Sequence, residues 1–324
     1  MALTAEQLVA RRERVGASDV AAIMGVPTFV GCNAWTTWAD KIGALEDERA
    51  NKPWLDEGNR LEPFILNWAE RELGALDRNV VVHDPSGARI ASTLDGRVIA
   101  SGVPVEAKTS GIFGPIHGEW GSDGTDEVPD GYLLQCQTQL LCTGAEVCRL
   151  FALLGGRGRV EYQIHPHPAL IAKIRDVAED FYAEFVVTRR DPREGWADRL
   201  EAVHGVKLTA DPCEPVLETA KRLRRVTGKV VDLQDPEPFL GWDRLRAERL
   251  EAEKAEKSAL AVCLAELGDA DAGQLPGGVV FTYAEQNGAD LIDREAMKRA
   301  GVYEQYATPN TVRVARLKGA KKGR

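Results

Sequence analysis

The sequence lacks the spacing of a metal-binding or iron–sulfur cysteine motif. Its six cysteines include no Cys-x-x-Cys pair, although Cys136, Cys142 and Cys148 follow one another at intervals of six residues. Zinc and iron–sulfur sites typically use two close cysteine pairs or similarly short spacings. Reduced thiols without a metal are therefore the better interpretation.

Long apolar runs are also missing. No stretch reaches the roughly 18 apolar residues that a membrane-spanning helix needs. The first 18 residues carry charges throughout and lack the apolar core of a secretory signal peptide. We therefore expect a cytoplasmic protein without a membrane partner.

An excess of positive charge, the usual mark of a nucleic-acid binder, is absent too, because the formal net charge is −9. The charge is uneven, however, since Arg11, Arg12 and Arg14 cluster near the start and no acid follows Glu304. Acidic residues at a metal site would also make the total negative. The basic tail, residues 313–324, either contacts DNA phosphates or a partner, or is a solvated, disordered end.

Residues 92–108 form the most informative stretch. Val98-Ile99 and Val103–Val105 are short β-favouring runs separated by Ala-Ser-Gly, so we predict a tight β-hairpin. Glu106 and Lys108 are two apart and share one face of their strand, and Asp95, at the entry to the hairpin, can approach them.

This pattern has a chemical interpretation. Two close carboxylates repel unless a cation lies between them, and two acids with one lysine suit a divalent metal and a phosphate. The order Asp95, Glu106, Lys108 is the D-x(n)-E-x-K arrangement of metal-dependent phosphodiester hydrolysis. A solvated hairpin with ordinary surface charges matches the same short pattern.

The residues upstream predict helices. We expect them at 4–14, at 18–24 with Ser18 or Asp19 as the N-cap, at 33–42, and at 53–73 with a break at Pro63. Arg14 lies four residues before Ser18, and together they predict a phosphate clamp, although a plain capped helix fits as well. Glu62, beside the break, either faces inward at the edge of the core or is solvated.

Period-two patterns downstream predict short antiparallel strands at 79–83, 89–93, 97–100 and 103–108, then strands at 146–154 and 159–164. Helices are expected at 130–143 and 168–187, and residues 109–130 form a long loop. On the helix at 130–143, Tyr132, Gln135 and Gln139 share one face. The fold class is α/β (α+β), a central mixed sheet flanked by helices, with the acids on its central hairpin.

The composition shifts after residue 190. Residues 191–215 read as a loop, 241–267 as a long charged helix, and residues 279–283 with Asn287-Gly288 as a hairpin. A short helix capped by Asp293 and a basic strand at 311–317 follow. We therefore predict a core at 1–195 and an accessory extension at 196–324 without a catalytic cluster.

Five short motifs in order resemble the YqaJ-like viral recombinase family, which belongs with lambda exonuclease in the PD-(D/E)XK nuclease superfamily. They are Arg14-Val-Gly-Ala-Ser18-Asp, Gly58-x-x-x-Glu62-Pro, Leu94-Asp95-Gly, Glu106-Ala-Lys108 and Gln135-Cys-Gln137. The resemblance covers roughly residues 10–190 and implies a restriction-endonuclease-like core. A leucine, not proline, precedes Asp95, and loop 109–130 has no counterpart in the family pattern.

The resemblance implies a 5′→3′ exonuclease that resects double-stranded DNA ends with Mg²⁺, with Mn²⁺ as a substitute and two ions per site. Glu62, Asp95 and Glu106, with the Ala107 carbonyl, would hold the metal. Lys108 would orient or deprotonate the attacking water, and Gln135 would place that water or the phosphate. The other implied residues are Arg14 and Ser18, which would bind the 5′ phosphate.

The implied partners are a single-strand annealing protein and further copies of the chain in a ring around DNA, in the host cytoplasm if a phage encodes the chain. Two alternatives stay open: a structure-specific endonuclease of the same superfamily, and a catalytically silent DNA-binding scaffold for recombination. Intact Glu62, Asp95, Glu106 and Lys108 argue against the scaffold.

Overall fold

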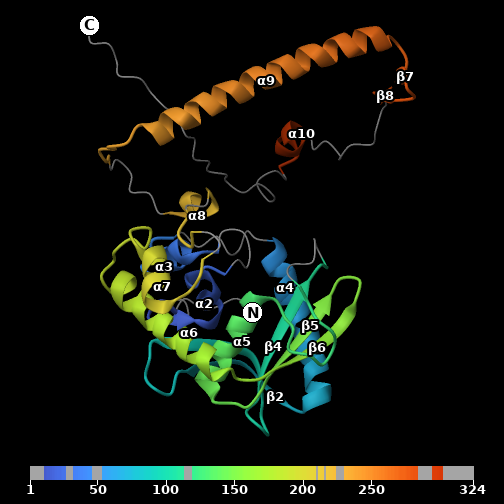
Figure 1. Ribbon diagram of the computed structural model, residues 1–324. Coiled ribbons are helices and arrows are strands. Elements are labelled where there is room, and N and C mark those ends of the chain that lie inside the picture. Colours follow the sequence, from blue (N-terminus) through green and yellow to red (C-terminus); the bar gives the residue numbers. More distant parts are fainter. Residues whose placement is uncertain are drawn as a thin grey trace. The chain divides into compact units, whose positions relative to one another are not determined.

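The computed structural model describes residues 11–26, 32–45, 53–112, 119–208, 211–214, 217–223, 230–283 and 294–301. The chain divides into two compact units, Met1–Thr227 and Gly228–Arg324 (Figure 1). Among the helices that these residues form, none is long and apolar enough to cross a bilayer.

A six-stranded sheet organises the first unit. Its strands are β1 Val15–Gly16, β2 Leu76–His83, β3 Ile90–Val98, β4 Pro104–Ser110, β5 Cys148–Leu154 and β6 Gly158–Ile164. The order is β1-β3-β4-β5-β6, and β2 also pairs with β3. The pairs β1/β3 and β4/β5 are parallel and the others are antiparallel. The expected mixed sheet is confirmed.

Strand β3 is longer than the sequence suggested. Two strands were predicted, at 89–93 and 97–100, but one continuous strand runs from Ile90 to Val98. Buried and half-buried residues alternate along its whole length, so the backbone stays extended through Asp95 and Gly96. The prediction was wrong because Asp and Gly usually interrupt strands. Asp95 therefore lies inside a paired strand.

Helices cover the sheet. Those of the first unit are α2 Ala17–Ile23, α3 Ala34–Lys41, α4 Pro53–Leu73, α5 Asp130–Thr143, α6 Pro168–Phe181, the π-helical η2 Tyr182–Val187, α7 Trp196–His204 and α8 Leu217–Arg222. The bounds predicted for α5 are confirmed, and Gly144 ends it at a φ of 66° in the left-handed region. Most of the helix expected at 4–14 lies outside the described residues.

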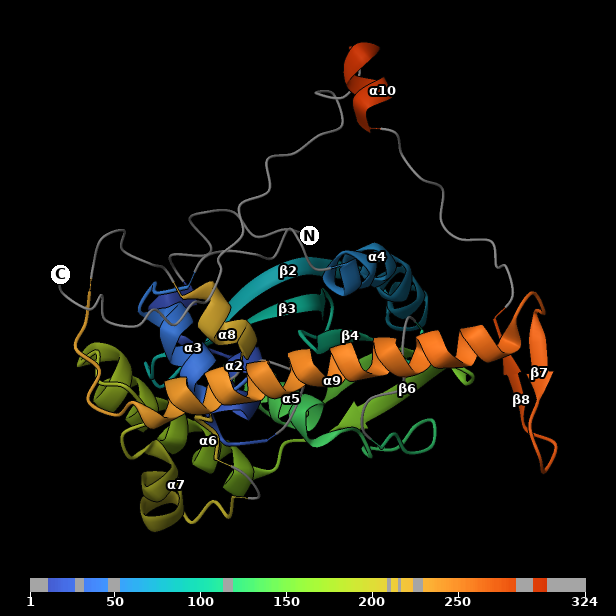
Figure 2. The same cartoon turned by 90° about the horizontal axis from the view of Figure 1, so that it is seen from above.

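Two helices lie on opposite faces of the sheet. Ile65 and Leu66 of α4 pack with Phe151 of β5, whereas Leu140 of α5 packs with Leu150 on the other face. Leu150 and Phe151 are adjacent in β5, and successive strand residues point to opposite faces. Figure 2 shows α4 and α5 on either side of the strands. Residues on the α5 face of β4 are thus covered by α5.

Helix α2 begins earlier than predicted. Its N-cap is Gly16, not Ser18 or Asp19, and the Asp19 carboxylate accepts a hydrogen bond from the Gly16 N–H at 2.8 Å. Asp19 thus provides a hydrogen-bond acceptor for the backbone N–H of the N-cap residue, as the acid of a capping box does. Lys41 pairs with Asp19 at 2.5 Å. Burial alone would raise the pKa of Asp19, but Lys41 and Arg11 outweigh burial and lower it.

Helix α7 was not predicted. Residues 191–215 were expected to be a loop, but Trp196–His204 is helical and the Trp196 ring is fully buried in the core of the first unit. The Trp196 Nε1–H donates to the Ile23 carbonyl at 2.8 Å. The first compact unit accordingly extends past residue 195, to Thr227. The predicted division at residue 195 remains a prediction about independently folding domains.

The second unit contains α9 Glu237–Leu267, the hairpin β7 Ala272–Gln274 with β8 Val280–Thr282, and α10 Arg294–Arg299. Helix α9 confirms the long charged helix, and none of its residues is buried. Strand β8 pairs with the preceding β7. Asn287-Gly288, the Asp293 cap, the strand at 311–317 and the basic tail lie outside the described residues.

Candidate functional site

The β3–β4 hairpin brings the predicted acids together. Gly96 pairs with Val105 and Arg97 with Pro104, so Asp95 lies beside the segment that carries Glu106. The Ala107 N–H donates to Asp95 Oδ2 at 2.8 Å. The predicted tight hairpin is therefore present, and it links Asp95 to the Glu106-Ala107-Lys108 strand directly.

Glu106 is almost fully enclosed, with 1% of its surface exposed. Its Oε1 accepts a hydrogen bond from Gln135 Nε2 at 2.6 Å and pairs with the Lys108 ammonium. Its Oε2 accepts a hydrogen bond from Gln139 Nε2. A buried carboxylate is costly unless such donors compensate it. Helix α5 and strand β4 together supply them.

Asp95 is electrostatically different from Glu106. Burial and the nearby Glu106 charge raise the pKa of Asp95 to about 8, although Lys108 and the Ala107 N–H act in the opposite direction. Two close carboxylates cannot both ionise cheaply without a cation. The pair Asp95 and Glu106 is therefore prepared to accept positive charge.

Lys108 provides part of that charge. Burial alone would lower the pKa of Lys108, but Glu106 and Asp95 outweigh burial and raise it. The ammonium also lies 5.1 Å from the centroid of the Tyr132 ring, at cation–π distance. Trp120 packs against Tyr132 with ring centroids 5.4 Å apart. Lys108 thus contacts Glu106 and the Tyr132 ring, which Trp120 supports.

The donor set suits a hard divalent cation. Carboxylate oxygens are the ligands that Mg²⁺ prefers, and Mg²⁺ is commonly held by one or two carboxylates while it keeps several waters. Asp95 and Glu106 meet that requirement. No group of three or more His, Cys, Asp or Glu residues that could hold a metal occurs in the part of the chain that the structure describes. The expected three-carboxylate cluster with Glu62 therefore stays a prediction.

Glu62 lies on α4 and is half-buried. Its charge contributes to the raised pKa of Asp95, but it is the smallest of the causes. Helix α4 runs without interruption from Pro53 to Leu73, so Pro63 does not restart it. The Ala107 N–H is engaged by Asp95, and the proposed use of its carbonyl as a ligand remains a prediction.

The predicted phosphate clamp of Arg14 and Ser18 has a further arginine beside it, Arg11. Ser18 is exposed in the first turn of α2, and its hydroxyl accepts a hydrogen bond from Arg11 Nη2 at 3.3 Å. Arg14 is half-buried just before β1. A clamp by Arg14 and Ser18 stays a prediction, and Arg11 is an additional cation at the same position.

Sequence reasoning missed three contributors to the site, Gln139, Tyr132 and Cys148. Gln139 bonds Glu106, and the Cys148 Sγ–H donates to Gln139 Oε1 at 3.2 Å. The helical face shared by Tyr132, Gln135 and Gln139 was the available signal, because successive members are three and four residues apart. No sequence signal connected Cys148 to that face.

Gln137 bonds a different part of the chain from the helical face that Tyr132, Gln135 and Gln139 share. Its amide bonds the backbone of the segment after β6, donating to the His165 carbonyl at 2.7 Å and accepting from the His167 N–H at 2.8 Å. Gln137 is thus a buried amide whose donor and acceptor both have backbone partners. The buried Cys136, Cys142 and Cys148 are thiols, as expected.

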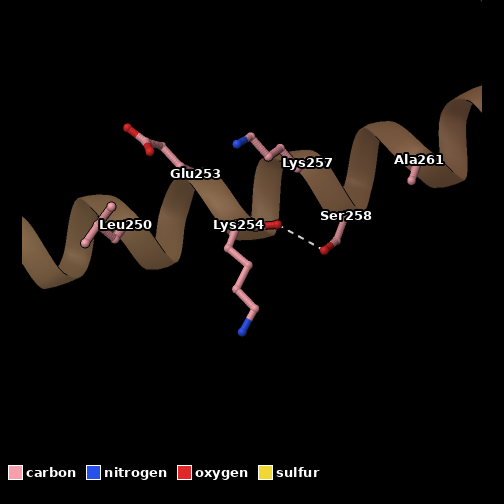
Figure 3. Close-up of a pocket in the computed structure, with 6 residues that line it drawn as sticks. All are labelled: Leu250, Glu253, Lys254, Lys257, Ser258 and Ala261. Carbon is pink, nitrogen blue, oxygen red and sulfur yellow. Dashed lines mark hydrogen bonds between the residues drawn. The ribbon is translucent and has the colours of Figure 1, made fainter.

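A hollow in the second unit lies along α9 and is a poor candidate for catalysis. Figure 3 shows its lining residues, all from this helix: Leu250, Glu253, Lys254, Lys257, Ser258 and Ala261. The Ser258 hydroxyl, the one nucleophile-like group among them, donates to the Lys254 carbonyl at 3.0 Å. Such back-bonding is ordinary for a serine within a helix.

Comparison with known families identifies the domain. The class that the fold and site indicate is a hydrolytic enzyme with a carboxylate–lysine centre on a mixed sheet. Residues 6–146 match the model of the YqaJ-like viral recombinase domain, the family that the five motifs resemble. The expected enzyme class, a nuclease, is confirmed at the level of the family.

Similar solved structures include three nucleases. An alkaline exonuclease, LHK-Exo from Laribacter hongkongensis, is 20% identical over 61% of this chain and 100% of that chain, with a TM-score of 0.45. A phage-related exonuclease from Haemophilus somnus 129PT is 16% identical over 54% and 96%, with a TM-score of 0.36. A putative exonuclease from Eubacterium rectale is 14% identical over 72% and 97%, with a TM-score of 0.35. No curated protein matches the chain. These TM-scores are too low to support an inference.

Proposed function

We propose that this protein is a Mg²⁺-dependent 5′→3′ exonuclease that resects linear double-stranded DNA for phage-type recombination by strand annealing. One observation carries the proposal: Asp95, Glu106 and Lys108 of the β3–β4 hairpin, predicted from two motifs, meet Gln135 of α5, predicted from a third. Surface charges on a solvated hairpin would not be buried and interlinked in this way.

The residues suit hydrolysis of a phosphodiester. A phosphodiester is anionic and repels hydroxide, so its attack requires local positive charge. Asp95 and Glu106 would hold Mg²⁺, which would neutralise the negative charge of the phosphodiester and supply hydroxide near neutral pH. Lys108, a compact cation next to Glu106, steadies the negative charge that develops on the phosphate.

Gln135 has a definite partner in the protein. Its amide donates to Glu106 Oε1 at 2.6 Å, so it fixes the carboxylate against Lys108. Placing the attacking water or the phosphate, as the family resemblance implies, requires the same amide to share its second N–H. An amide nitrogen has two donors and can serve both partners.

The remaining predicted residues belong to the proposal as supporting elements. Glu62 and the Ala107 carbonyl complete the metal ligands, with two ions per site and Mn²⁺ as a substitute. Arg14 and Ser18 bind the phosphate at the 5′ end, with Arg11 beside Ser18 as a further cation. The selection of a 5′ end thus falls to α2 and its preceding residues, and the cut falls to the hairpin.

The proposed partners follow from the same reaction. Double-stranded DNA ends are the substrate, and the single strand left behind goes to an annealing protein in the host cytoplasm. A ring formed by several copies of the chain around DNA would keep the enzyme bound to its substrate.

Digestion of three DNA substrates tests the proposal. Linear duplexes labelled at the 5′ or 3′ end and a covalently closed circle are incubated with Mg²⁺ or with EDTA. We expect Mg²⁺-dependent release of the 5′ label first, and no attack on the circle. Equal cutting of the circle would show an endonuclease, and no Mg²⁺-dependent cutting of either would show a silent scaffold.

A variant tests the end-binding part separately. Arg14→Ala should remove the preference for a 5′ phosphate over a 5′ hydroxyl, because the arginine supplies the charge that recognises the phosphate. Lys207→Ala, which removes an exposed lysine of the first unit, is the matched control. An undiminished preference in Arg14→Ala would remove this residue from the clamp.

A further inference from the structure

A chain of buried polar groups lies behind Glu106. Gln139 and Cys148 both have 0% of their surface exposed. The Cys148 thiol donates to Gln139 Oε1 at 3.2 Å, and Gln139 Nε2 donates to Glu106 Oε2. The chain therefore runs from β5, through α5, to the metal-binding carboxylate on β4.

We infer that Gln139 and Cys148 are positioning residues for Mg²⁺: the Cys148 thiol orients the Gln139 amide, and the amide holds Glu106 in the metal-binding orientation. The inference rests on the proposed function. Neither residue touches the substrate, so each acts through Glu106.

The direction of the Gln139 amide carries the first step. An amide presents an acceptor oxygen on one side and a donor nitrogen on the other. If the amide were reversed, its oxygen would face Glu106 Oε2 and two acceptors would repel each other. Cys148 offers a hydrogen to the oxygen, which leaves the nitrogen for Glu106.

The second step concerns the thiol itself. The thiol is a weak donor in general, and the hydrogen that it offers to Gln139 Oε1 at 3.2 Å lies where both side chains are fully buried. The position therefore suits a small residue that donates one hydrogen.

The third step concerns the lone-pair direction of the Glu106 carboxylate that remains available to a metal. A carboxylate offers about four lone-pair directions. Gln135 and Lys108 use Oε1, and Gln139 uses Oε2. The free direction belongs to Oε2, the oxygen that Gln139 holds, so Glu106 offers a metal a single oxygen in a set orientation. Loss of Gln139 would let the carboxylate rotate.

Mg²⁺ affinity of the DNA-free protein, measured by titration calorimetry, tests the inference. Outer partners of metal ligands typically contribute about 10-fold to 100-fold in metal affinity. We expect Gln139→Met to weaken Mg²⁺ binding by about that range, and Cys148→Ala by about 10-fold, the lower end of it. Cys148→Ser retains a donor and should restore affinity close to that of wild type.

Two controls on α5 separate positioning from simple loss of stability. Gln137→Met removes a buried amide that bonds the backbone near His165, and Cys142→Ala shortens a buried cysteine. Both should lower the metal-free melting temperature without changing Mg²⁺ affinity. Each variant is compared at a temperature well below its own melting point.

The outcomes discriminate clearly. Weakened binding in Gln139→Met and Cys148→Ala, with recovery in Cys148→Ser and none lost in the controls, supports the inference. Wild-type affinity in Gln139→Met, while wild type binds Mg²⁺ and cuts DNA, overturns the inference alone. Wild-type protein that neither binds Mg²⁺ nor cuts DNA overturns the proposed function and, with it, the inference.

Discussion

At the scale of single residues, the carboxylates of Asp95 and Glu106 differ in how many donors hold them and in their electrostatics. Glu106 is enclosed by donors at both oxygens, from Lys108, Gln135 and Gln139. Asp95 accepts the Ala107 N–H, and burial beside Glu106 raises its pKa to about 8. One carboxylate is thus held in place, and the other gains most from an added cation.

A second buried acid permits a prediction about stability and pH. The Asp84 side chain is fully buried and accepts hydrogen bonds from Arg175 Nε at 2.7 Å and from the Ser86 N–H at 2.9 Å. Burial alone would raise the pKa of Asp84, but these partners outweigh it and lower the pKa. The stabilisation is therefore complete above the unfolded value of about 3.9 and is lost as pH falls through the folded value.

We expect Asp84→Asn to lower the free energy of unfolding by about 1–3 kcal/mol at pH 7, and by progressively less below about pH 4. Urea denaturation across this range measures it. Asp77→Asn, which removes a surface pair with Arg97, should change stability by less than about 0.5 kcal/mol. A deficit in Asp84→Asn that stays constant down to pH 3 would contradict the assignment.

At the scale of elements, helix α5 serves the site and the core at once. Tyr132, Gln135 and Gln139 face the β4 residues, while Leu140 packs on β5. The helix bounds and the shared face were predictable from the sequence, because both depend on local spacing. Which strand that face meets depends on the pairing of β4 with β5, residues more than 40 apart, and could not be predicted.

Two other elements show the same limit. The hairpin turn was predictable from Val98, Val103 and the glycine between them, but the continuity of β3 through Asp95 was not. Local propensity disfavours Asp and Gly in a strand, and pairing with β2 and β4 overrides it. Motif order predicted the candidate residues Asp95, Glu106, Lys108 and Gln135, whereas the contact of Cys148 with Gln139 required the folded structure.

Helix α7 provides a prediction at this scale. Trp196 is fully buried against Phe181 and Phe185, with ring centroids 5.0 and 5.5 Å away. Trp196→Ala leaves a large cavity and an unpaired Ile23 carbonyl, so we expect a loss of about 3–5 kcal/mol in chemical denaturation. Trp242→Ala, on the exposed face of α9, is the control and should change stability little. Equal effects of both variants would contradict the packing of α7.

At the scale of the whole molecule, the chain separates a first unit that carries the site from a second unit built around α9. The burial of Trp196 gives a physical reason for the first unit to extend past residue 195, since a chain cut at 195 would lose that anchor. In the second unit, none of the α9 residues is buried, and no chemistry is assigned to its described residues.

The central claim is that the hairpin beneath α5 cuts DNA, and Lys108→Ala tests it most directly. The measurement is Mg²⁺-dependent release of nucleotides from linear duplex DNA by wild type, Lys108→Ala and the control Lys207→Ala, with melting temperatures recorded for all three. We expect release to fall at least about 100-fold in Lys108→Ala, because the cation beside Glu106 is lost, and to be unchanged in Lys207→Ala. Release at the wild-type rate by folded Lys108→Ala would contradict the claim.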